Sequence, residues 1–553
     1  MQNIRHIEPE VFIFNEDGFH DVSEFVQTIF TQNSLDMPVG TAHLTFNPSN
    51  TGKLSTNITH NKILNHVKKL LKINSIISIK IDKFSKSHTF LGRIDHRYES
   101  IVANNNSNSR VLKVNASMML PKLLLRDFIA NSPALSESEE MRNFFGERIN
   151  FFEWGRGATI KGGNVFTAEP IEAVKWILEN AVATNSTVLS RDPNSATGLI
   201  AKTFFDPKKK TLENGDPMLI LKFLKGEYLF DSNLTTYSGN ILEYLHAAID
   251  LDFYELFFDT ETGDDGLAYN SMTIRPKPFS YTSYNSLVDK IVLDGWQYFD
   301  SDLRSVTKNS SQRIQEDLGV SDFDLKNFFS VNFTQSLVAN SNNLLGKFGV
   351  QFPMLLKNSI KKNGLRQVQL TSKMVHSAGW KQLAEKYNAA VKENRIEPVD
   401  KIADETGLIN MLLEKREKAY EWNAFPYFES GQVQWVGDES LKIGKKLIYE
   451  DKEYFHEEEE KVYKGVHYYI KSVNHQFGYG SFYKTLTGLT KGAPENVAPK
   501  WLNENRENVF GVNKSIQKEY QKSLTNANAI FDERTKKELD DLDKTMFEMK
   551  SIA

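Results

Sequence analysis

The most regular pattern of apolar and polar positions lies at Phe253–Phe279. Its first part, Phe253–Phe258, is an almost continuous apolar run that is too short for a buried helix and rich in aromatic residues, which predicts a strand covered on both faces. Asp259–Gly266 combines glycines with acidic residues and threonines, as hairpin loops do. Met272–Arg275 then alternates until Pro276, which cannot donate to a strand ladder. The pattern predicts a central β-hairpin.

Similar patterns extend toward the N-terminus. Ser238–Asp250 predicts a capped amphipathic helix immediately before the hairpin. Period-two alternation predicts further strands at Val11–Phe14, Gly40–Asn47, Ile73–Asp82 and Arg110–Asn115, with a helix at Met118–Ile129. Phe90–Ile94 predicts another strand, in which a glycine marks a bulge or a close approach.

Beyond the hairpin, strands and helical periodicity alternate in longer blocks. Strands are predicted within Gly295–Ile314, Asp322–Phe333, Gln432–Val436, Leu441–Tyr449, His467–Phe477 and Phe482–Gly492. Helical spacing of apolar residues predicts helices at Glu169–Ala183, His376–Glu393, Thr406–Trp422 and Lys514–Ile552.

Together these elements predict an α+β, multidomain chain, because 553 residues exceed what one core organises. Short strands between polar turns near the N-terminus favour a small barrel or sandwich. A second barrel at the C-terminal end is implied by the family resemblance given below, so the predicted fold has two small antiparallel β-barrels. The predicted domains are a first barrel at 1–118, a helical or mixed insertion at 119–237, an α/β domain with the central hairpin at 238–333, a largely helical insertion at 334–428, a second barrel at 429–495 and a C-terminal helical tail at 496–553.

Composition narrows the function classes. The net charge is −4, so the chain has no basic excess for binding nucleic acid by counterion release. It contains no cysteine, which excludes disulfides and thiolate metal sites. No apolar run is long enough to span a bilayer, and the N-terminus lacks the apolar core of a signal peptide. We expect a chain that folds in a cytoplasm and reaches other places as part of an assembly.

The sequence contains no strong catalytic or metal-binding motif. Neither His-Glu-x-x-His nor Gly-x-Ser-x-Gly occurs. Glycine-rich Glu153–Gly163 fits a surface loop better than a phosphate loop, and His467 and His475 are interpreted as ordinary hydrogen-bonding groups. The hairpin acids Asp259, Glu261, Asp264 and Asp265 fit a solvated tip better than a calcium site. We therefore predict no catalytic residue, no cofactor and no metal.

Several phrases of the sequence resemble one protein family. "ELFFD" followed by "IRPKPF" in the hairpin, and "DVSEFV", "MPVGTAHLTFNP" and "FLGRI" near the N-terminus, resemble the central baseplate hub proteins of contractile tailed phages, whose fold also forms the hub half of type VI secretion spike proteins. "HYYIKSVNHQF" and "FYKTLTGLTKG" resemble the closing barrel of those hubs. "KNSIKKNGLR" matches a further family phrase, with Asn363 where tyrosine is usual.

The resemblance implies a structural protein rather than an enzyme. In that family, a hub joins the tail tube, or a distal tail protein, to the central spike and adapts sixfold to threefold symmetry. The resemblance therefore also implies a homotrimer in the virion baseplate, contact with the tape-measure protein, and a channel that DNA passes through. Two alternatives stay open. One is a cell-wall hydrolase located in 119–235 or 335–425, and the other is a receptor-binding module.

Overall fold

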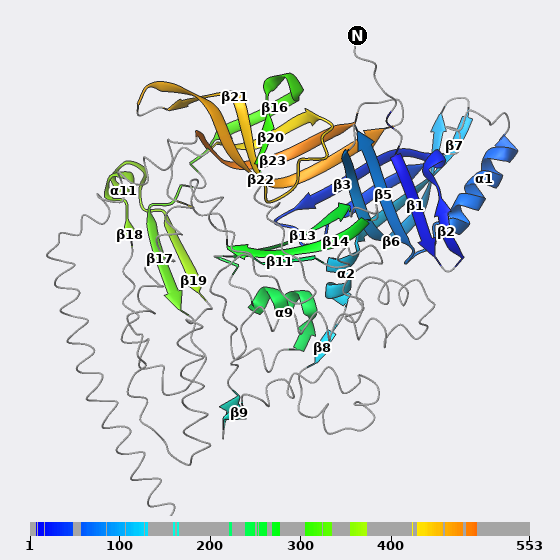
Figure 1. Ribbon diagram of the computed structural model, residues 1–553, viewed down its shortest axis with the longest axis horizontal. Helices are drawn as coiled ribbons and strands as arrows, with labels where there is room; N and C mark the ends of the chain where they lie inside the picture. The colour runs from blue at the N-terminus through cyan, green and yellow to red at the C-terminus, as the bar shows by residue number, and fades with distance from the viewer. Residues whose placement is uncertain are drawn as a thin grey trace, which may run out of the picture.

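The structure of the chain is a computed structural model, which describes residues 7, 9–15, 17–47, 57–83, 86–104, 107–126, 128–130, 159–160, 163–164, 220–223, 238–248, 251–252, 254–262, 268–276, 305–322, 325–333, 354–372, 423, 429–456, 459–478 and 483–494. Strands from both ends of the chain form one 13-stranded sheet (Figure 1). Its N-terminal strands are β1 (Pro9–Asn15), β2 (Gly18–Asp21), β3 (Val26–Ser34), β4 (Thr41–Phe46), β5 (Ile76–Lys83), β6 (Lys86–Asn104) and β7 (Ser107–Met118). Its later strands are β15 (Ser305–Lys308), β16 (Arg313–Val320), β20 (Glu429–Val436), β21 (Lys446–His456), β22 (Lys461–Gly478) and β23 (Lys484–Pro494).

Four smaller sheets lie beside the large one. The central hairpin, β13 (Tyr254–Thr262) and β14 (Ala268–Pro276), takes β11 (Ile220–Phe223) as a third strand. The others comprise β8 (Phe128–Ala130) with β12 (Ser238–Asn240), β9 (Thr159–Ile160) with β10 (Gly163–Asn164), and β17 (Phe328–Phe333) with β18 (Met354–Leu355) and β19 (Gln367–Ser372). The helical elements are α1 (Asn57–Leu70), α2 (Met119–Arg126), α9 (Ile241–Ala248), α11 (Lys357–Asn363) and the 3₁₀ turns η1 (Ser23–Phe25) and η7 (Ser310–Gln312).

Most of the predicted strands are found, with shifted ends. The strand predicted at Leu441–Tyr449 begins only at Lys446, and the one predicted within Asp322–Phe333 begins at Phe328. In β4 every second residue is buried, as the period-two alternation requires, and in β5 the buried Ile77, Ile79 and Ile81 alternate in the same way, with Ile76 buried as well. The glycine of the predicted Phe90–Ile94 strand is also explained, because a Cβ on Gly92 would lie 2.7 Å from the Ser117 carbonyl oxygen and still closer to the Phe90 ring. The central hairpin pairs in continuous antiparallel register from Tyr254 opposite Pro276 to Thr262 opposite Ala268.

The prediction of two barrels is wrong for the described residues, because the strands predicted for both barrels belong to one large, mostly antiparallel sheet. The physical reason is the length of β22. Its 18 residues exceed what β21 can pair with, and the excess pairs with β3 from the other end of the chain. Spacing along the sequence gives no sign of a pairing between residues so far apart.

The predicted helices have mixed outcomes. Helix α9 is confirmed but begins later than predicted, because Ser238–Asn240 pairs as β12 and Asn240 caps the helix by accepting a 2.7 Å hydrogen bond from the Glu243 backbone. Helix α2 is confirmed at Met119–Arg126. The predicted helices at 169–183, 376–393, 406–422 and 514–552 fall outside the described residues, as does all of 496–553. In the part of the chain that the structure describes, no helix is long and apolar enough to cross a membrane.

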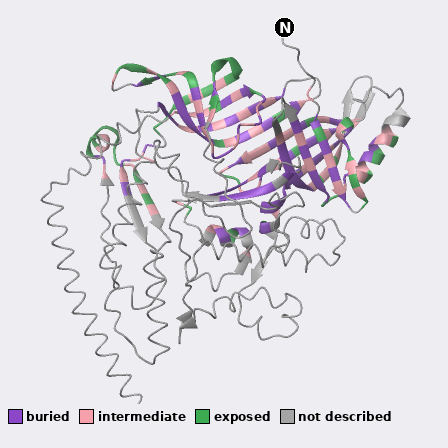
Figure 2. Ribbon diagram, viewed as in Figure 1, coloured by how far each residue is buried: buried purple, intermediate pink, exposed green. Residues whose placement is uncertain are grey.

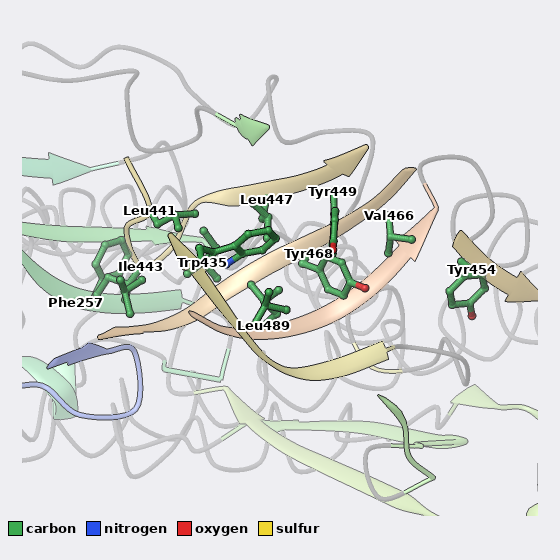
Figure 3. Packing of buried hydrophobic residues seen from close by; sticks show 13 residues of the cluster. Phe257, Trp435, Leu441, Ile443, Leu447, Tyr449, Tyr454, Val466, Tyr468 and Leu489 are labelled. Atoms are coloured by element: carbon green, nitrogen blue, oxygen red, sulfur yellow. The ribbon is translucent and has the colours of Figure 1, made fainter. Parts of the chain in front are cut away.

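A cluster of thirteen buried apolar residues lies mainly on the C-terminal strands and the turn before β21 (Figure 3), and Figure 2 shows the buried positions along the whole sheet. Trp435 is fully buried there, with its ring edge-on to Tyr449 at a centroid distance of 5.2 Å. The cluster also includes Phe257 from the central hairpin. The hairpin therefore shares a core with strands nearly two hundred residues further along the chain, and this connection positions the site described next.

Candidate functional site

The two ends of the large sheet repeat one topology. We call β1–β7 the N-terminal half-sheet, and β15, β16 and β20–β23 the C-terminal half-sheet. The spatial order is β3-β4-β7-β6-β5-β1-β2 in the first and β16-β20-β23-β22-β21-β15 in the second. If the strands are matched by their order along the chain, β3, β4, β5, β6 and β7 correspond to β16, β20, β21, β22 and β23. The matched strands have the same neighbours in both half-sheets, and all these neighbours are antiparallel. The end strands differ, since β15 takes the place of β1 but runs parallel to its neighbour.

Two irregularities of the backbone occur at matching places in the half-sheets, whereas the shifts in the β20–β23 and β21–β22 ladders have no counterpart in the described β4–β7 and β5–β6 ladders. The β6–β7 register shifts between Ile94 and His96, and the β22–β23 register shifts between Ile470 and Ser472. The β3–β4 register shifts after Val26, and the β16–β20 register shifts after Arg313. β-Bulges are retained structural features rather than random defects in strand pairing, so bulges at matching positions support a structural repeat.

The turns that enter β5 and β21 are also alike. Ile94 exchanges 2.9 Å backbone hydrogen bonds with Asn74 and Ser75, and Ile470 exchanges bonds of 2.9 and 3.0 Å with Gly444 and Lys445. Asn74 and Gly444 both have positive φ, at 71° and 74°. Asparagine and glycine are the residues that tolerate this left-handed conformation, so two different sequences build one turn.

The half-sheets join through β22. Its first part pairs with β21, and Ser472–Gly478 pairs with β3 on the same side, with His475 opposite Thr31. On its other side β22 pairs with β23 from Val466 to Gln476. One long strand thus belongs to the C-terminal half-sheet and forms the backbone-paired joint to the N-terminal one.

The central hairpin crosses this joint and binds both sides. On the N-terminal side, Asn33 donates to the Phe258 carbonyl at 2.9 Å and the Leu91 backbone donates to Thr260 at 3.3 Å. On the C-terminal side, Lys442 pairs with Asp259 at 3.1 Å and donates to the Thr260 carbonyl at 3.1 Å.

A further bond, from the Tyr469 hydroxyl to Glu255, is 2.5 Å long and buried. Buried hydrogen bonds to charged groups are among the stronger polar contacts. The hairpin therefore fastens the joint at several points.

Two histidines stack inside the joint. His88 of β6 and His475 of β22 lie with ring centroids 3.7 Å apart, and Thr31 binds His88 while Tyr483 binds His475, at 2.9 and 2.7 Å. Burial, with Lys442 nearby, lowers the pKa of His475 to about 3. Burial and the facing imidazole hold the pKa of His88 well below its ordinary value. Both rings are neutral at physiological pH, because a charge on either one would be buried beside the other ring and Lys442.

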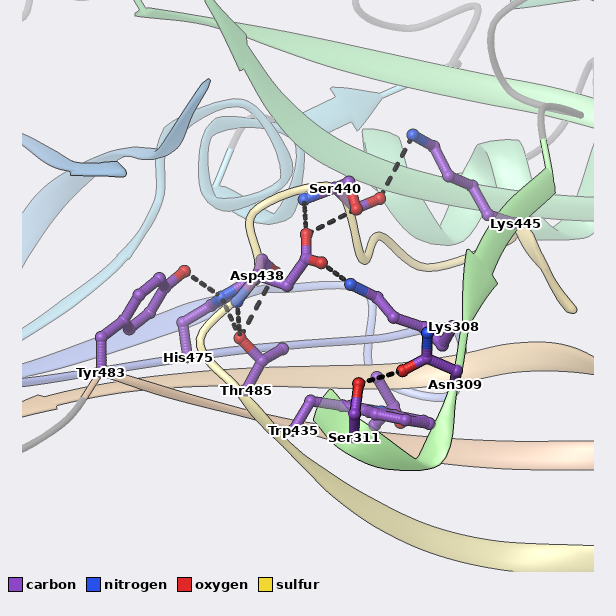
Figure 4. A network of polar contacts seen from close by, with 11 residues as sticks. Lys308, Asn309, Ser311, Trp435, Asp438, Ser440, Lys445, His475, Tyr483 and Thr485 are labelled. Atoms are coloured by element: carbon purple, nitrogen blue, oxygen red, sulfur yellow. Dashed lines mark hydrogen bonds and ion pairs between the residues drawn. The ribbon is translucent and has the colours of Figure 1, made fainter. Parts of the chain in front are cut away.

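A polar network connects His475 to the start of the C-terminal half-sheet (Figure 4). Thr485 receives a 2.9 Å bond from the Asp438 backbone and lies 3.3 Å from His475. The Asp438 carboxylate forms an ion pair with buried Lys308 of β15. Since an uncompensated buried ammonium is costly, this pair fixes β15 against the 437–445 turn.

A second network holds β16. Glu316 accepts hydrogen bonds from Lys452, Arg313 and, at 3.1 Å, Tyr449. Burial opposes ionisation of Glu316, but these donors outweigh it and lower its pKa. Burial, together with the nearby Glu316 charge, raises the pKa of Tyr449 to about 12. Through these side chains β16 approaches β21, although no backbone pairing between the two is recorded among the described strands.

The residues considered in the sequence as sites have structural partners or lie outside the description. Asp259 pairs with Lys442, while the side chains of Glu261, Asp264 and Asp265 are not among those described. His475 is hydrogen-bonded, as interpreted, and His467 is buried in β22. Across the described residues, no three histidine or acidic side chains gather in a way that would hold a metal ion.

Sequence reasoning missed the joint itself. The stacked histidines are 387 positions apart in the chain, and nothing in the sequence connects His88 with the phrase that contains His475. The one available signal was the unusual length of the strand-like region before Phe477, which exceeds a typical strand.

No protein-family model and no curated protein matches the sequence. Among solved structures, the chain is similar to a tail protein from Neisseria meningitidis MC58, with a TM-score of 0.37 and 8% identity over 87% of this chain and 96% of that one. It is similar to a 43 kDa tail protein of prophage MuSo2 from Shewanella oneidensis, with a TM-score of 0.38 and 8% identity over 87% and 98%. It is also similar to an E. coli type VI secretion component, described as structurally similar to bacteriophage T4 tail proteins, with a TM-score of 0.31 and 8% identity over 85% and 74%.

Proposed function

We propose that this chain is the central hub of a phage tail baseplate or of a related contractile injection machine. The observation that carries the proposal is the repeated half-sheet, joined edge to edge inside one chain. A chain with two equivalent sheets presents two equivalent units to a ring. Three copies then present six units while keeping threefold symmetry.

Six similar units from three copies fit a protein that lies between a sixfold and a threefold partner. The six units face the tail tube or a distal tail protein, and the threefold axis serves the spike. The tape-measure protein meets the hub at the channel, which DNA crosses without specific binding, consistent with a net charge of −4. The protein resides in the virion baseplate after assembly in the host cytoplasm, and it acts as a structural part rather than as an enzyme.

The domain boundaries fit this role as follows. The segments 1–118 and 429–495 carry most of the two half-sheets, and β15 and β16, from 238–333, complete the second. The hairpin of 238–333 fastens the joint. The insertions 119–237 and 334–428 and the tail 496–553 then present surfaces to neighbouring tail proteins.

Native mass spectrometry of the purified full chain, alone and with its spike protein, tests the proposal. We expect a homotrimer. A monomer or a closed hexamer in both samples contradicts the hub assignment. Zymography on the same preparation tests the hydrolase alternative, and a glycan-binding assay on host envelopes tests the receptor-binding alternative. If either assay is positive and no trimer is found, the corresponding alternative replaces the hub assignment.

A further inference from the structure

The stacked histidines connect the two half-sheets, because His88 belongs to β6 and His475 to β22. Their rings are nearly parallel, with an interplanar angle of 19° and centroids 3.7 Å apart. His475 is only 4% exposed, and its Nδ1 lies 2.7 Å from the Tyr483 hydroxyl and 3.3 Å from the Thr485 hydroxyl. The Nε2 of His88 lies 2.9 Å from the hydroxyl of Thr31, which is opposite His475 in the β3–β22 ladder. The two rings therefore lie at the ladder that joins the half-sheets.

The groups that face the two rings favour neutral imidazoles. Lys442, in the turn before β21, is the nearby cation, and the hairpin binds its ammonium through the Asp259 carboxylate and the Thr260 carbonyl, each at 3.1 Å. Burial, with Glu439 nearby, raises the pKa of Tyr483, so this hydroxyl stays neutral as well. Among the described residues, the rings are hydrogen-bonded to hydroxyl groups and to no carboxylate. An imidazolium at either position would therefore lack a compensating negative charge.

Each half-sheet buries apolar residues of its own. The thirteen-residue cluster is drawn from the C-terminal strands and the turn before β21, with Phe257 of the hairpin as the one addition. In the N-terminal half-sheet, β1 and β4 bury residues such as Val11 and Leu44. The half-sheets meet along the seven positions Ser472–Gly478 of β22, which pair with β3. Units that keep their own apolar contacts can open separately, so the half-sheets can part along this ladder without either one losing its core.

We propose that the joint is an acid-sensitive latch, in which protonation of His88 and His475 separates the half-sheets along the β3–β22 ladder while each half-sheet stays folded. In the closed joint, a charged ring would be stacked on the other imidazole beside Lys442. In the open joint both rings are in water and titrate as ordinary imidazoles. Protons therefore bind the open form more tightly, and acid shifts the equilibrium toward it. The inference concerns the single chain and does not rest on the proposed hub.

Proton linkage gives the direction and the size of the shift. The pKa of His475 is about 3 in the closed joint, where burial and nearby Lys442 lower it, and about 6.5 for an imidazole in water. The latch is therefore fully closed above about pH 6.5 and weakens as the pH falls. Between about pH 7 and pH 4, His475 alone multiplies the ratio of open to closed chains by about 200. Burial and the facing imidazole also lower the pKa of His88, so it adds to the shift in the same direction.

Hydrogen exchange of the full-length chain, followed by mass spectrometry at about pH 7 and pH 4 and corrected for the intrinsic exchange rate at each pH, tests the latch. The double variant H88Q/H475Q removes both titrating rings. The variant F30C/Q476C places thiols at opposed positions of the β3–β22 ladder, so that a disulfide locks the joint in a chain without other cysteines. The matched control T45C/K113C places thiols at opposed positions of β4 and β7, inside one half-sheet. Opposed Cα atoms in antiparallel strands lie about 4.5–5.5 Å apart, which a disulfide spans.

At pH 4 we expect the protection of the amides that bond across the β3–β22 ladder to fall by about 200-fold or more in the wild type and in oxidised T45C/K113C. The protection of the β4–β7 and β20–β23 ladders should stay unchanged. Oxidised F30C/Q476C should keep its protection and lose it on reduction, and H88Q/H475Q should keep most of its protection.

Three results would overturn the latch. An equal fall in H88Q/H475Q would exclude the histidines as the trigger, and a fall of the same size in every ladder would report unfolding of the whole chain rather than separation at the joint. Unchanged protection of the wild-type ladder at pH 4 would show that the joint does not open. If H88Q/H475Q does not fold at pH 7, the comparison of oxidised F30C/Q476C with oxidised T45C/K113C decides where the chain opens, and the single variant H475Q, with a smaller fall than the wild type, decides the trigger.

Discussion

Replacing His475 by glutamine should make the protein markedly less sensitive to mild acid. Glutamine keeps a polar group near Tyr483 and Thr485, which bind the imidazole at 2.7 and 3.3 Å, but it does not titrate. His88 stacks on the ring of His475, and burial together with nearby Lys442 disfavours a protonated ring at this position.

The size of the effect follows from proton linkage. The pKa of His475 is about 3 in the folded chain and about 6.5 when the chain is unfolded, so the unfolded state binds the extra proton between these values. Stability is therefore complete above about pH 6.5 and falls by about 1.4 kcal/mol for each pH unit below it, until the folded pKa is reached. Between about pH 7 and pH 5 this histidine alone costs the wild-type chain about 2 kcal/mol.

Urea unfolding followed by tryptophan fluorescence, at about pH 7 and pH 5, measures this difference. We expect the loss of unfolding free energy on acidification to be about 2 kcal/mol smaller in H475Q than in the wild type. The variant H43Q, which changes an exposed histidine of β4, serves as the control and should lose as much as the wild type. Equal losses in H475Q and the wild type would show that the joint does not hold a buried neutral imidazole.

Three other perturbations test separate parts of the structure. Gly431→Ala should destabilise the chain by about 2–4 kcal/mol in urea unfolding, because φ is +149° and the new Cβ would clash with the Asp317 carbonyl. The control Gly319→Ala, where nothing lies within 4 Å of the new Cβ, should be neutral or slightly stabilising. Equal effects of the two substitutions would contradict the β16–β20 pairing. Trp435→Phe should cost about 1–3 kcal/mol by leaving a void and removing the 2.8 Å bond to Thr487, and unchanged thermal unfolding would contradict the packing of the cluster. Deletion of 514–553 should leave a folded trimer that no longer incorporates into baseplates, and normal incorporation in a complementation assay would show that the tail is dispensable.

Local elements were predictable because their periodicity is local. The alternation in Thr41–Phe46 and Ile76–Lys83 gives strand and inward face together, and the aromatic run before Asp259 gives the central hairpin. The resemblance of the phrases at both ends of the chain also indicated that two related units lie there. These inferences need only a few neighbouring residues each.

The joint between the half-sheets was not predictable, because the residues that form it are far apart in the sequence and do not follow a recognisable pattern. Thr485 and Thr487 face inward although apolar Leu486 lies between them, since they satisfy Asp438, Trp435 and a backbone carbonyl. From the alternation of apolar and polar residues, one would expect Leu486 rather than the two threonines to face inward. Likewise, the repeat is carried by bulges and by a left-handed turn that uses Asn74 in one half-sheet and Gly444 in the other, with no shared sequence phrase.

The position of the hairpin accounts for two symmetries in the proposed ring. If three copies form the ring, six similar half-sheets surround its axis, two from each chain. The hairpin β13–β14 is supplied once per chain and crosses only the joint within the chain, where Asn33, Lys442 and Tyr469 hold it. The backbone of the ring therefore approximates sixfold symmetry, while the hairpins, one per chain, follow the threefold axis. A partner that pairs with the strands meets six similar sites, and a partner that binds beside the hairpins meets three.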